Sequence, residues 1–338
     1  MTHTATQRTV RDGQRRGTAV NIWLMGAVGV LGAFQLFVLP LVLLPASPAW
    51  GWALVTVPLM TTPFWSLVHE AIHGTLLADR TRSDRCGRVM AVVYGAPFIL
   101  LKTGHLLHHR FSRTPRERVE IYDPVKTTWA KVAPVYYLRL VIGLYLLEVL
   151  SLVLALLPAA ALRRLAVRTE SPDTVAGLLL DRIAADRNRV QFRVDSALIV
   201  LLYGAAFLAY GTHAWMLALA IVGRALVVSI SDNAYHYGTK LDAPLEAMNL
   251  RLSRPLERFA LSFNLHDVHH RHPGLRWYEL RPQFLSEGSP YHLGWFAAAA
   301  RQFRGPIRLA ASAGREAPGP APEERGSPLV GRAGRRPE

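Results

Sequence analysis

The sequence predicts an all-α membrane protein with two transmembrane helical hairpins, four spans in all, and additional interfacial helices. Three observations support this prediction. Of the 338 residues, 51% are hydrophobic and only 19% are charged. The mean hydropathy is +0.17, which few soluble domains of this size reach. The long uncharged stretches also occur in two pairs, each interrupted by a short uncharged turn.

The first predicted hairpin consists of Ile22–Leu44 and Ala49–Val68, which are 23 and 20 residues without a charge. Each stretch can cross a hydrocarbon core of about 30 Å at 1.5 Å per residue. Arginines flank the hairpin but are absent from its turn, so the positive-inside rule puts both ends in the cytoplasm. These arginines are Arg8, Arg11, Arg15 and Arg16 before the hairpin, and Arg80, Arg82, Arg85 and Arg88 after it.

The second predicted hairpin runs from Ser196 to about Gly211 and returns from Ala214 to Ile230. Its turn is uncharged, whereas the segment before it is again basic, with Arg193 nearest to the first arm. This arm is short for a span. We therefore expect its helix to begin a few residues before Ser196 or to lie where the bilayer is thinner.

Two further apolar stretches, Val89–Leu101 and Pro134–Leu162, are predicted to be interfacial or re-entrant helices on the cytoplasmic side. A full crossing by the second stretch would put the arginines that follow it outside, and would reverse the side on which His236 emerges. Glu148 and Pro158 also disfavour an ordinary span. A fifth crossing is the alternative.

Charge and cysteine content exclude several functional classes. The 39 basic and 24 acidic side chains give a net charge of +15, which suits a nucleic acid or an anionic membrane surface. The apolar stretches favour the membrane, so we expect no nucleic-acid partner. The single cysteine, Cys86, excludes a disulfide framework, a thiolate zinc site and a built-in iron–sulfur electron carrier. Any electrons must come from another protein.

Eight of the 13 histidines lie in three five-residue windows, His69–His73, His105–His109 and His266–His270. Structural histidines in a protein core do not cluster in this way. Residues three or four apart share one face of a helix, so each window presents its imidazoles in a single direction. Neutral imidazole is a common ligand of first-row metals.

The three windows are expected at one face of the membrane. The first follows the second span, the second follows a short apolar helix, and the third lies beyond the fourth span. Eight or nine imidazoles exceed the four ligands of a tetrahedral zinc ion, but would supply two metal ions with four or five ligands each. We infer a histidine-rich dinuclear iron site on the cytoplasmic side.

With these windows, the sequence resembles the membrane-bound fatty acid desaturases and their relatives: acyl hydroxylases, carotenoid ketolases and hydroxylases, and alkane monooxygenases. The resemblance covers roughly residues 22–305. It depends on the HxxxH, HxxHH and HxxHH windows, on their order relative to two hairpins, and on the stretch HHRHPGLRWY at 269–278. It implies that the desaturase-like membrane domain spans 21–310, after a basic cytoplasmic N-terminus (1–20) and before a disordered tail (311–338).

The resemblance also implies the iron ligands. Eight come from the three windows, and a ninth is implied at His236 in the stretch DNAYHYG, which follows the fourth span. The implied ligands are His69, His73, His105, His108, His109, His236, His266, His269 and His270.

Several other residues are candidates for supporting roles. Glu70, Asp232 and Asp267 are predicted to contact ligands rather than to react themselves. Relatives often have asparagine four residues before the fourth-span histidine, where this chain has Asp232. This carboxylate has several predicted roles: to bind iron directly or through water, to orient His236, or to pair with Arg224 within the span.

Four remaining histidines have less specific interpretations. His3 lies in the N-terminal segment that is expected to be disordered, so it is expected to be solvated. His213 lies in the predicted turn of the second hairpin, and His292 lies beyond the third window. We expect both to be structural or solvated. His272, two residues past the third window, is predicted to support a ligand or to lie on the surface.

The family resemblance implies an O2-dependent oxidoreductase that receives electrons from an external donor, such as ferredoxin with its reductase. Desaturation of a fatty acyl chain is the preferred reaction, and hydroxylation or ketonisation of an acyl lipid, carotenoid or alkane is the alternative.

His69–His73 also matches HExxH, the motif of zinc proteases in which glutamate is the general base. A protease would leave most of the clustered histidines unexplained. A metal carrier or haem-binding membrane protein is a further, non-enzymatic alternative.

Overall fold

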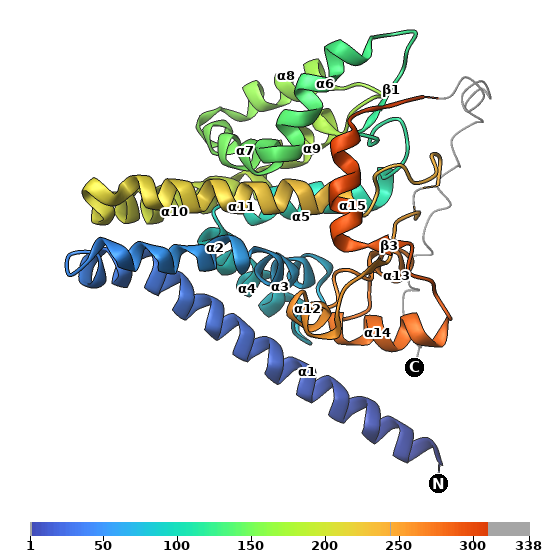
Figure 1. Cartoon of the computed structure of the whole chain (residues 1–338), viewed down its shortest axis with the longest axis horizontal. Helices are drawn as coiled ribbons and strands as arrows, with labels where there is room; N and C mark the ends of the chain where they lie inside the picture. The colour runs from blue at the N-terminus through green and yellow to red at the C-terminus, as the bar shows by residue number, and fades with distance from the viewer. Residues whose placement is uncertain (1, 244, 310–338) are drawn as a thin grey trace, which may run out of the picture.

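The computed structural model describes residues 2–243 and 245–309, which are mostly helical (Figure 1). The predicted tail at 311–338 lies outside the described residues. Three helices are long and apolar enough to cross a membrane, Gly17–Leu43, Trp129–Leu156 and Asp186–Ala234. Two bent helix pairs raise the number of candidate spans to five. The helical membrane class predicted from the sequence is therefore confirmed.

The first hairpin is present, but its returning arm is broken. The outgoing arm is a continuous helix that includes a π-helical segment at Pro40. The returning helices meet at 43° near Met60, so this arm is bent where one span was predicted. The hairpin's elements are α1 (Thr2–Ala33), η1 (Phe34–Leu43), η2 (Pro48–Val55), α2 (Thr56–Leu59) and α3 (Thr61–His73).

The next helix pair turns sharply back on itself. Asp79 caps α4 (Arg80–Tyr94) by accepting a hydrogen bond from the Arg82 amide at 2.7 Å. The helix then meets α5 (Phe98–Phe111) at 104°. Gly95 ends α4 at a φ of +98°, and a Cβ there would lie 2.7 Å from the Tyr145 hydroxyl, so only glycine suits this corner. Such a bend fits either a broken span or a re-entrant segment, so the interfacial or re-entrant placement of Val89–Leu101 stays a prediction.

The second hairpin comprises α10 (Asp186–Tyr210), η5 (Gly211–His213) and α11 (Ala214–Ala234). Helix α10 begins ten residues before Ser196, which confirms the early start predicted for this arm. Both hairpins turn at the same end of the molecule, on the left of Figure 1. Apolar side chains including Leu39, Leu54 and Leu217 form a buried cluster between the two hairpins.

A helix of four parts crosses the second hairpin at the end opposite its turn, here called the open end. Its first part is linked to the end of α11 through Gln302. The Tyr136 hydroxyl donates to the Gln302 backbone carbonyl, and the Gln302 side-chain amide donates to the Ile230 carbonyl. At the other end of this helix, Arg193, which lies near the start of α10, donates to the carbonyls of Ala155 and Leu157. The parts are α6 (Trp129–Leu138), η3 (Arg139–Gly143), α7 (Leu144–Leu150) and η4 (Ser151–Leu156).

This helix is long and apolar enough to span a membrane, although Pro134–Leu162 is predicted to be interfacial. Both of its ends lie near the open end of the α10–α11 hairpin, away from the turn at Gly211–His213. Its length and composition also fit the alternative of a fifth crossing, so the interfacial or re-entrant helix stays a prediction. The helices α8 (Ala159–Thr169) and α9 (Ala176–Ala184) then lead back to α10.

The C-terminal segments cover the open end of the hairpins (Figure 1). They form short helices and three strands. Strands β2 and β3 pair in parallel with each other, and β4 pairs in parallel with β1, which follows α5. The helices are α12 (Arg254–Phe259), α13 (His266–Arg271), α14 (Trp277–Ser286), α15 (Trp295–Arg301) and η6 (Gln302–Arg304). The strands are β1 (Ile121–Tyr122), β2 (Leu250–Arg251), β3 (Leu293–Gly294) and β4 (Ile307–Arg308).

The predicted topology can be tested by labelling single cysteines in a Cys86→Ser background. Cysteines at Ser47 and Thr212 should react with an impermeant reagent from outside, because both lie in hairpin turns. Cysteines at Arg82 and Thr169 should react only after the cytoplasmic face is opened. External labelling at position 169 would show that 129–156 crosses the membrane, and would contradict the four-span topology.

Candidate metal centre

The three histidine windows and His236 come together at the open end of the hairpins (Figure 1). The first window ends α3, the second lies in the last turns of α5, and the third forms most of α13. His236 follows the end of α11, where its backbone amide donates to the Asn233 carbonyl at 3.1 Å. Elements separated by up to about two hundred residues of sequence therefore contribute to one centre.

The nine histidines divide into two groups. Within each group, one ring nitrogen from every histidine lies within 4.8 Å of the others. The groups are adjacent, since the rings of His109 and His270 stack with their centroids 4.4 Å apart. The first group is His69, His73, His105, His109 and His269, and the second is His108, His236, His266 and His270.

The Nε2 atoms converge in both groups. In the first group, the Nε2 atom of His105 lies 2.9 Å from that of His73 and 3.0 Å from that of His109. In the second, the Nε2 atoms of His266 and His270 are 3.1 Å apart. Each such contact can share at most one proton, so several lone pairs face one another. This arrangement fits two cations.

Two buried nitrogens reinforce this fit. The Nε2 atoms of His69 and His236 have no hydrogen-bond partner among the described residues. An unsatisfied buried polar atom costs about 1–3 kcal/mol. A metal ion in each group would satisfy one of these two atoms.

Burial keeps the third-window imidazoles neutral. It lowers the pKa of His266, His269 and His270 well below the usual value, and neighbouring histidines lower it further because they would repel a second positive charge. A neutral imidazole has a free lone pair for a metal ion. The environment therefore favours the protonation state that ligation requires.

A model of the family described as fatty acid desaturase matches residues 45–298. The chain belongs to the fatty acid desaturase family. Comparisons with curated proteins and with solved structures found no match. The match covers most of the chain and includes all three histidine windows, and it confirms the family resemblance. The centre of this desaturase family member is accordingly a histidine cluster compatible with metal binding.

Glu117 contacts the second group and is not evident from the sequence. Its Oε1 lies 2.7 Å from the Nδ1 of His108, so the carboxylate can accept the ring proton and leave Nε2 free. Burial alone would raise the pKa of Glu117, but the neighbouring His108 outweighs it and the pKa lies below the usual value. A lone glutamate eight residues after a histidine window gives no periodic signal, because the intervening chain leaves the helix at Phe111.

Glu70 joins the first window to the residues that follow the third. Its Oε1 accepts the backbone N–H of Trp277 at 3.1 Å, and its Oε2 accepts the Thr75 hydroxyl at 2.9 Å. Neither metal group contains a carboxylate oxygen. A protease base must face a metal-bound water, whereas both oxygens of Glu70 are already used in structural contacts. This geometry disfavours the HExxH protease alternative.

Asp232 is close to the second group without belonging to it. It lines a small cavity with Arg139 and Ser229, between α11 and η3. No ion pair joins it to Arg224 among the described residues, because Arg224 instead donates to the Tyr94 carbonyl at 2.7 Å. The structure thus gives no support to the Arg224 pairing, and the part of Asp232 at the metal centre stays a prediction.

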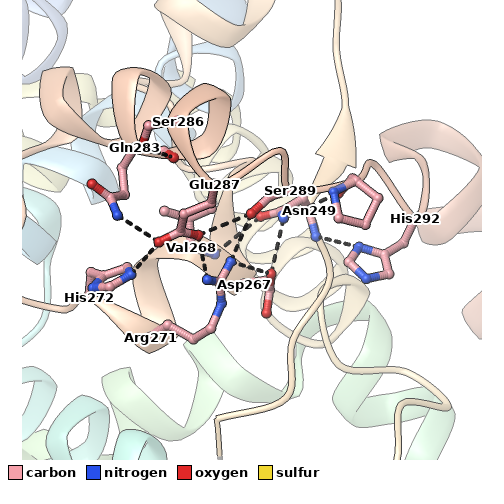
Figure 2. Close-up of polar contacts among 11 residues, drawn as sticks. Asn249, Asp267, Val268, Arg271, His272, Gln283, Ser286, Glu287, Ser289 and His292 are labelled. Carbon is pink, nitrogen blue, oxygen red and sulfur yellow. Dashed lines mark hydrogen bonds and ion pairs between the residues drawn. The ribbon is translucent and has the colours of Figure 1, made fainter.

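Asp267 belongs to a polar network that fixes the third window (Figure 2). It accepts hydrogen bonds from Asn249 at 3.1 Å and from Arg271 at 3.0 Å, and Arg271 also pairs with Glu287. Figure 2 shows the Arg271 guanidinium between these two carboxylates. The buried Asn249 also accepts the Val268 amide through its side-chain oxygen, so it anchors the beginning of α13.

The network also includes two histidines that belong to neither metal group. His272 pairs with Glu287 at 2.6 Å, and the Nδ1 of His292 accepts the Asn249 amide at 3.0 Å. His213 lies in η5, in the turn of the second hairpin. The structure therefore separates these three histidines from the nine that converge.

Removing the Glu117 carboxylate should weaken metal binding to the second group. In Glu117→Ala, metal affinity should fall by about 10–100-fold, the usual effect of losing a carboxylate that orients a histidine ligand. Titration of metal-free protein with Fe²⁺ would measure this change. The matched control is Glu170→Ala, which removes an exposed ion pair with Arg116. Unchanged affinity in Glu117→Ala would mean that His108 does not need this contact.

Proposed function

We propose that this desaturase family member is a membrane-bound, non-haem diiron oxidoreductase that uses O2 and external electrons to desaturate a fatty acyl chain. The observation that carries the proposal is the convergence of nine imidazoles into adjacent groups of five and four. One tetrahedral zinc ion binds only four ligands, whereas two iron ions would bind all nine imidazoles. Family membership supports a lipid substrate.

The proposed ligands of the first iron ion are His69, His73, His105, His109 and His269, and those of the second are His108, His236, His266 and His270. Bound iron would supply the O2-dependent oxidising power that removes hydrogen from an unactivated C–H bond. The chain itself must hold the imidazoles neutral, fix their directions and keep water away.

Aromatic side chains contribute to that exclusion of water. The Phe263 ring lies 5.1 Å from the ring of His69 and 5.0 Å from that of His266, so it touches both groups. The Trp65 ring lies 6.4 Å from His105 and 6.1 Å from Tyr94, between the first group and the interior of the bundle. An apolar chain that approaches the centre along these rings would meet a dry, rigid surface.

The electron donor is proposed to be a separate protein such as ferredoxin with its reductase, because the single cysteine excludes an iron–sulfur carrier within the chain. We propose that the centre faces the cytoplasm, where such a donor is available. The basic segments at the open end of both hairpins support this orientation.

Metal analysis and lipid analysis test the function together. The purified protein should contain two iron ions per chain. His69→Ala, His108→Ala, His236→Ala and His269→Ala should each lose metal and activity, because each removes a proposed ligand. His213→Ala is the matched control and should retain both. A host that expresses the protein should accumulate unsaturated acyl chains, and more of them with ferredoxin and its reductase.

Other outcomes would identify the alternatives. Hydroxylated or keto products would replace desaturation with oxygen insertion at the same centre. One zinc ion per chain, or haem absorbance, would refute the diiron proposal. Full activity of His236→Ala would remove this residue from the site.

Glu70→Gln separates an oxidoreductase from a protease. We expect a graded loss of metal and turnover, roughly 10-fold, because the side chain stabilises the contact between the first window and Trp277. Thr75→Val should have a similar effect, since it removes the same hydrogen bond from the other partner. If Glu70 were a protease base, the Glu70→Gln variant would lose all turnover while retaining its metal, and the Thr75→Val variant would keep its turnover. Metal content and turnover of both variants measure the difference.

A further inference from the structure

His236 lies beyond the end of the helix that leads to it. Helix α11 ends at Ala234, and a turn follows in which Gly238 has a φ of +73°. The Nδ1 of His236 lies 3.5 Å from the Ser112 hydroxyl oxygen and 3.4 Å from the Glu246 carbonyl oxygen. Contacts of this length orient a ring only weakly. The direction of His236 therefore depends on how the backbone of the turn is held.

A buried arginine from another segment holds this turn. Arg113 follows the second histidine window, and its side chain is 2% exposed. One terminal nitrogen donates to the Thr239 carbonyl at 2.8 Å, and its Nε lies 3.5 Å from the Lys240 carbonyl oxygen. The Thr239 amide donates in turn to the His236 carbonyl at 3.0 Å. A single residue, Thr239, thus connects the guanidinium of Arg113 to the backbone of His236.

Glu120 completes the contact between the two segments. Its buried Oε1 accepts a hydrogen bond from the Nη1 of Arg113 at 2.7 Å and another from the Gly238 amide at 3.1 Å. A buried ion pair is stable only where further hydrogen bonds satisfy its atoms. Here the backbone of residues 238–240 supplies such bonds to both partners, so the pair and the turn depend on each other.

The loop between the two charged residues also reaches His108. Arg113 has a φ of +65°, in the left-handed region that bulky residues rarely adopt, and its amide donates to the Glu117 carbonyl at 2.9 Å. The Oε1 of Glu117 lies 2.7 Å from the Nδ1 of His108. A strained conformation persists only where surrounding contacts fix it. The ion pair that joins residues 113 and 120 is such a contact.

We propose that Arg113 and Glu120 are positioning residues for the second group. Their ion pair, the Arg113–Glu120 clamp, fastens the loop after α5 to the turn after α11 and so directs His236 toward His108, whose ring centroid lies 4.7 Å from that of His236. The role rests on the proposed function, since it assumes a metal ion in the second group. Among the described residues, neither side chain of the clamp forms a hydrogen bond with a histidine of the first group.

Arg113→Lys tests the clamp through metal binding. Lysine can keep the ion pair with Glu120, but a single ammonium cannot also replace the guanidinium fork that reaches the Thr239 carbonyl. Titration of metal-free protein with Fe²⁺ should show one ion binding at least about 10-fold more weakly, as expected for loss of a hydrogen bond from a charged group. The other ion should bind as in the wild type. Adding His69→Ala should remove it, which assigns it to the first group.

The matched control is Arg88→Lys. Arg88 also donates two hydrogen bonds to a buried carboxylate, that of Asp195, but this pair joins α4 to α10. The variant should bind both ions normally. Unchanged affinity for both ions in Arg113→Lys would overturn the proposal. Equal weakening of both ions would also overturn it, because the pair would then support the fold in general.

Chemical labelling of metal-free protein tests the clamp without metal or turnover. Diethyl pyrocarbonate acylates accessible neutral imidazoles, and mass spectrometry measures the product at each histidine. His236 is 5% exposed and His69 is 4% exposed, so both should react slowly in the wild type. In Arg113→Lys, labelling of His236 should be at least about 10-fold faster, whereas His69 should stay slow. Unchanged protection of His236 would contradict the clamp, while failure of the diiron proposal would appear as fewer than two iron ions in the wild type.

Gly238→Val provides a second test if Arg113→Lys fails to fold. Gly238 is exposed, and a Cβ there would lie 3.4 Å from the nearest atom, in Arg301. A β-branched residue strains the backbone at the positive φ of this turn, so the same ion should bind more weakly and His236 should react faster. The control is Gly211→Val in the turn of the second hairpin, where φ is +51° and the space is open. Wild-type metal binding and labelling in Gly238→Val would overturn the proposal.

Discussion

The structure depends on one arrangement, in which nine imidazoles bring ring nitrogens together in two adjacent groups. Each nitrogen would lose its water on burial without gaining an obvious partner. The groups are nonetheless adjacent, and His69 and His236 have no other partner for these atoms among the described residues. Cations in the two groups would replace the lost hydrogen bonds, so we expect metal binding to stabilise the folded chain.

The surrounding elements supply the rigidity that this convergence requires. The sharp corner at Gly95 brings α5 beside α3, and the bend near Met60 directs the first window toward it. Asn249 and Asp267 hold α13 from the opposite side. None of these contacts involves an Nε2 atom of the nine histidines, yet together they fix the helix directions on which the distances between the imidazoles depend.

Among the described residues, the two candidate ligand groups contain histidines and no carboxylate. Glu117 contacts the Nδ1 of His108, while Glu70 connects α3 to Trp277. Both lie outside the two ligand groups. With cations bound, such an all-imidazole centre would carry a higher positive charge than a carboxylate-bridged one. The buried Arg224, on α11, borders an apolar pocket that no described histidine lines.

The sequence by itself determined the helical membrane class, the two hairpins and the nine clustered histidines, because hydropathy and the spacing of residues along a helix are local properties. The sequence did not show which histidine belongs to which of the two groups. The neighbours His108 and His109 belong to different groups, as do His269 and His270, because consecutive residues point about 100° apart on a helix. Which group each joins depends on the packing of α3, α5 and α13. The contacts of Glu117 and Asn249 likewise exist only after distant segments meet, so tertiary structure alone decided them.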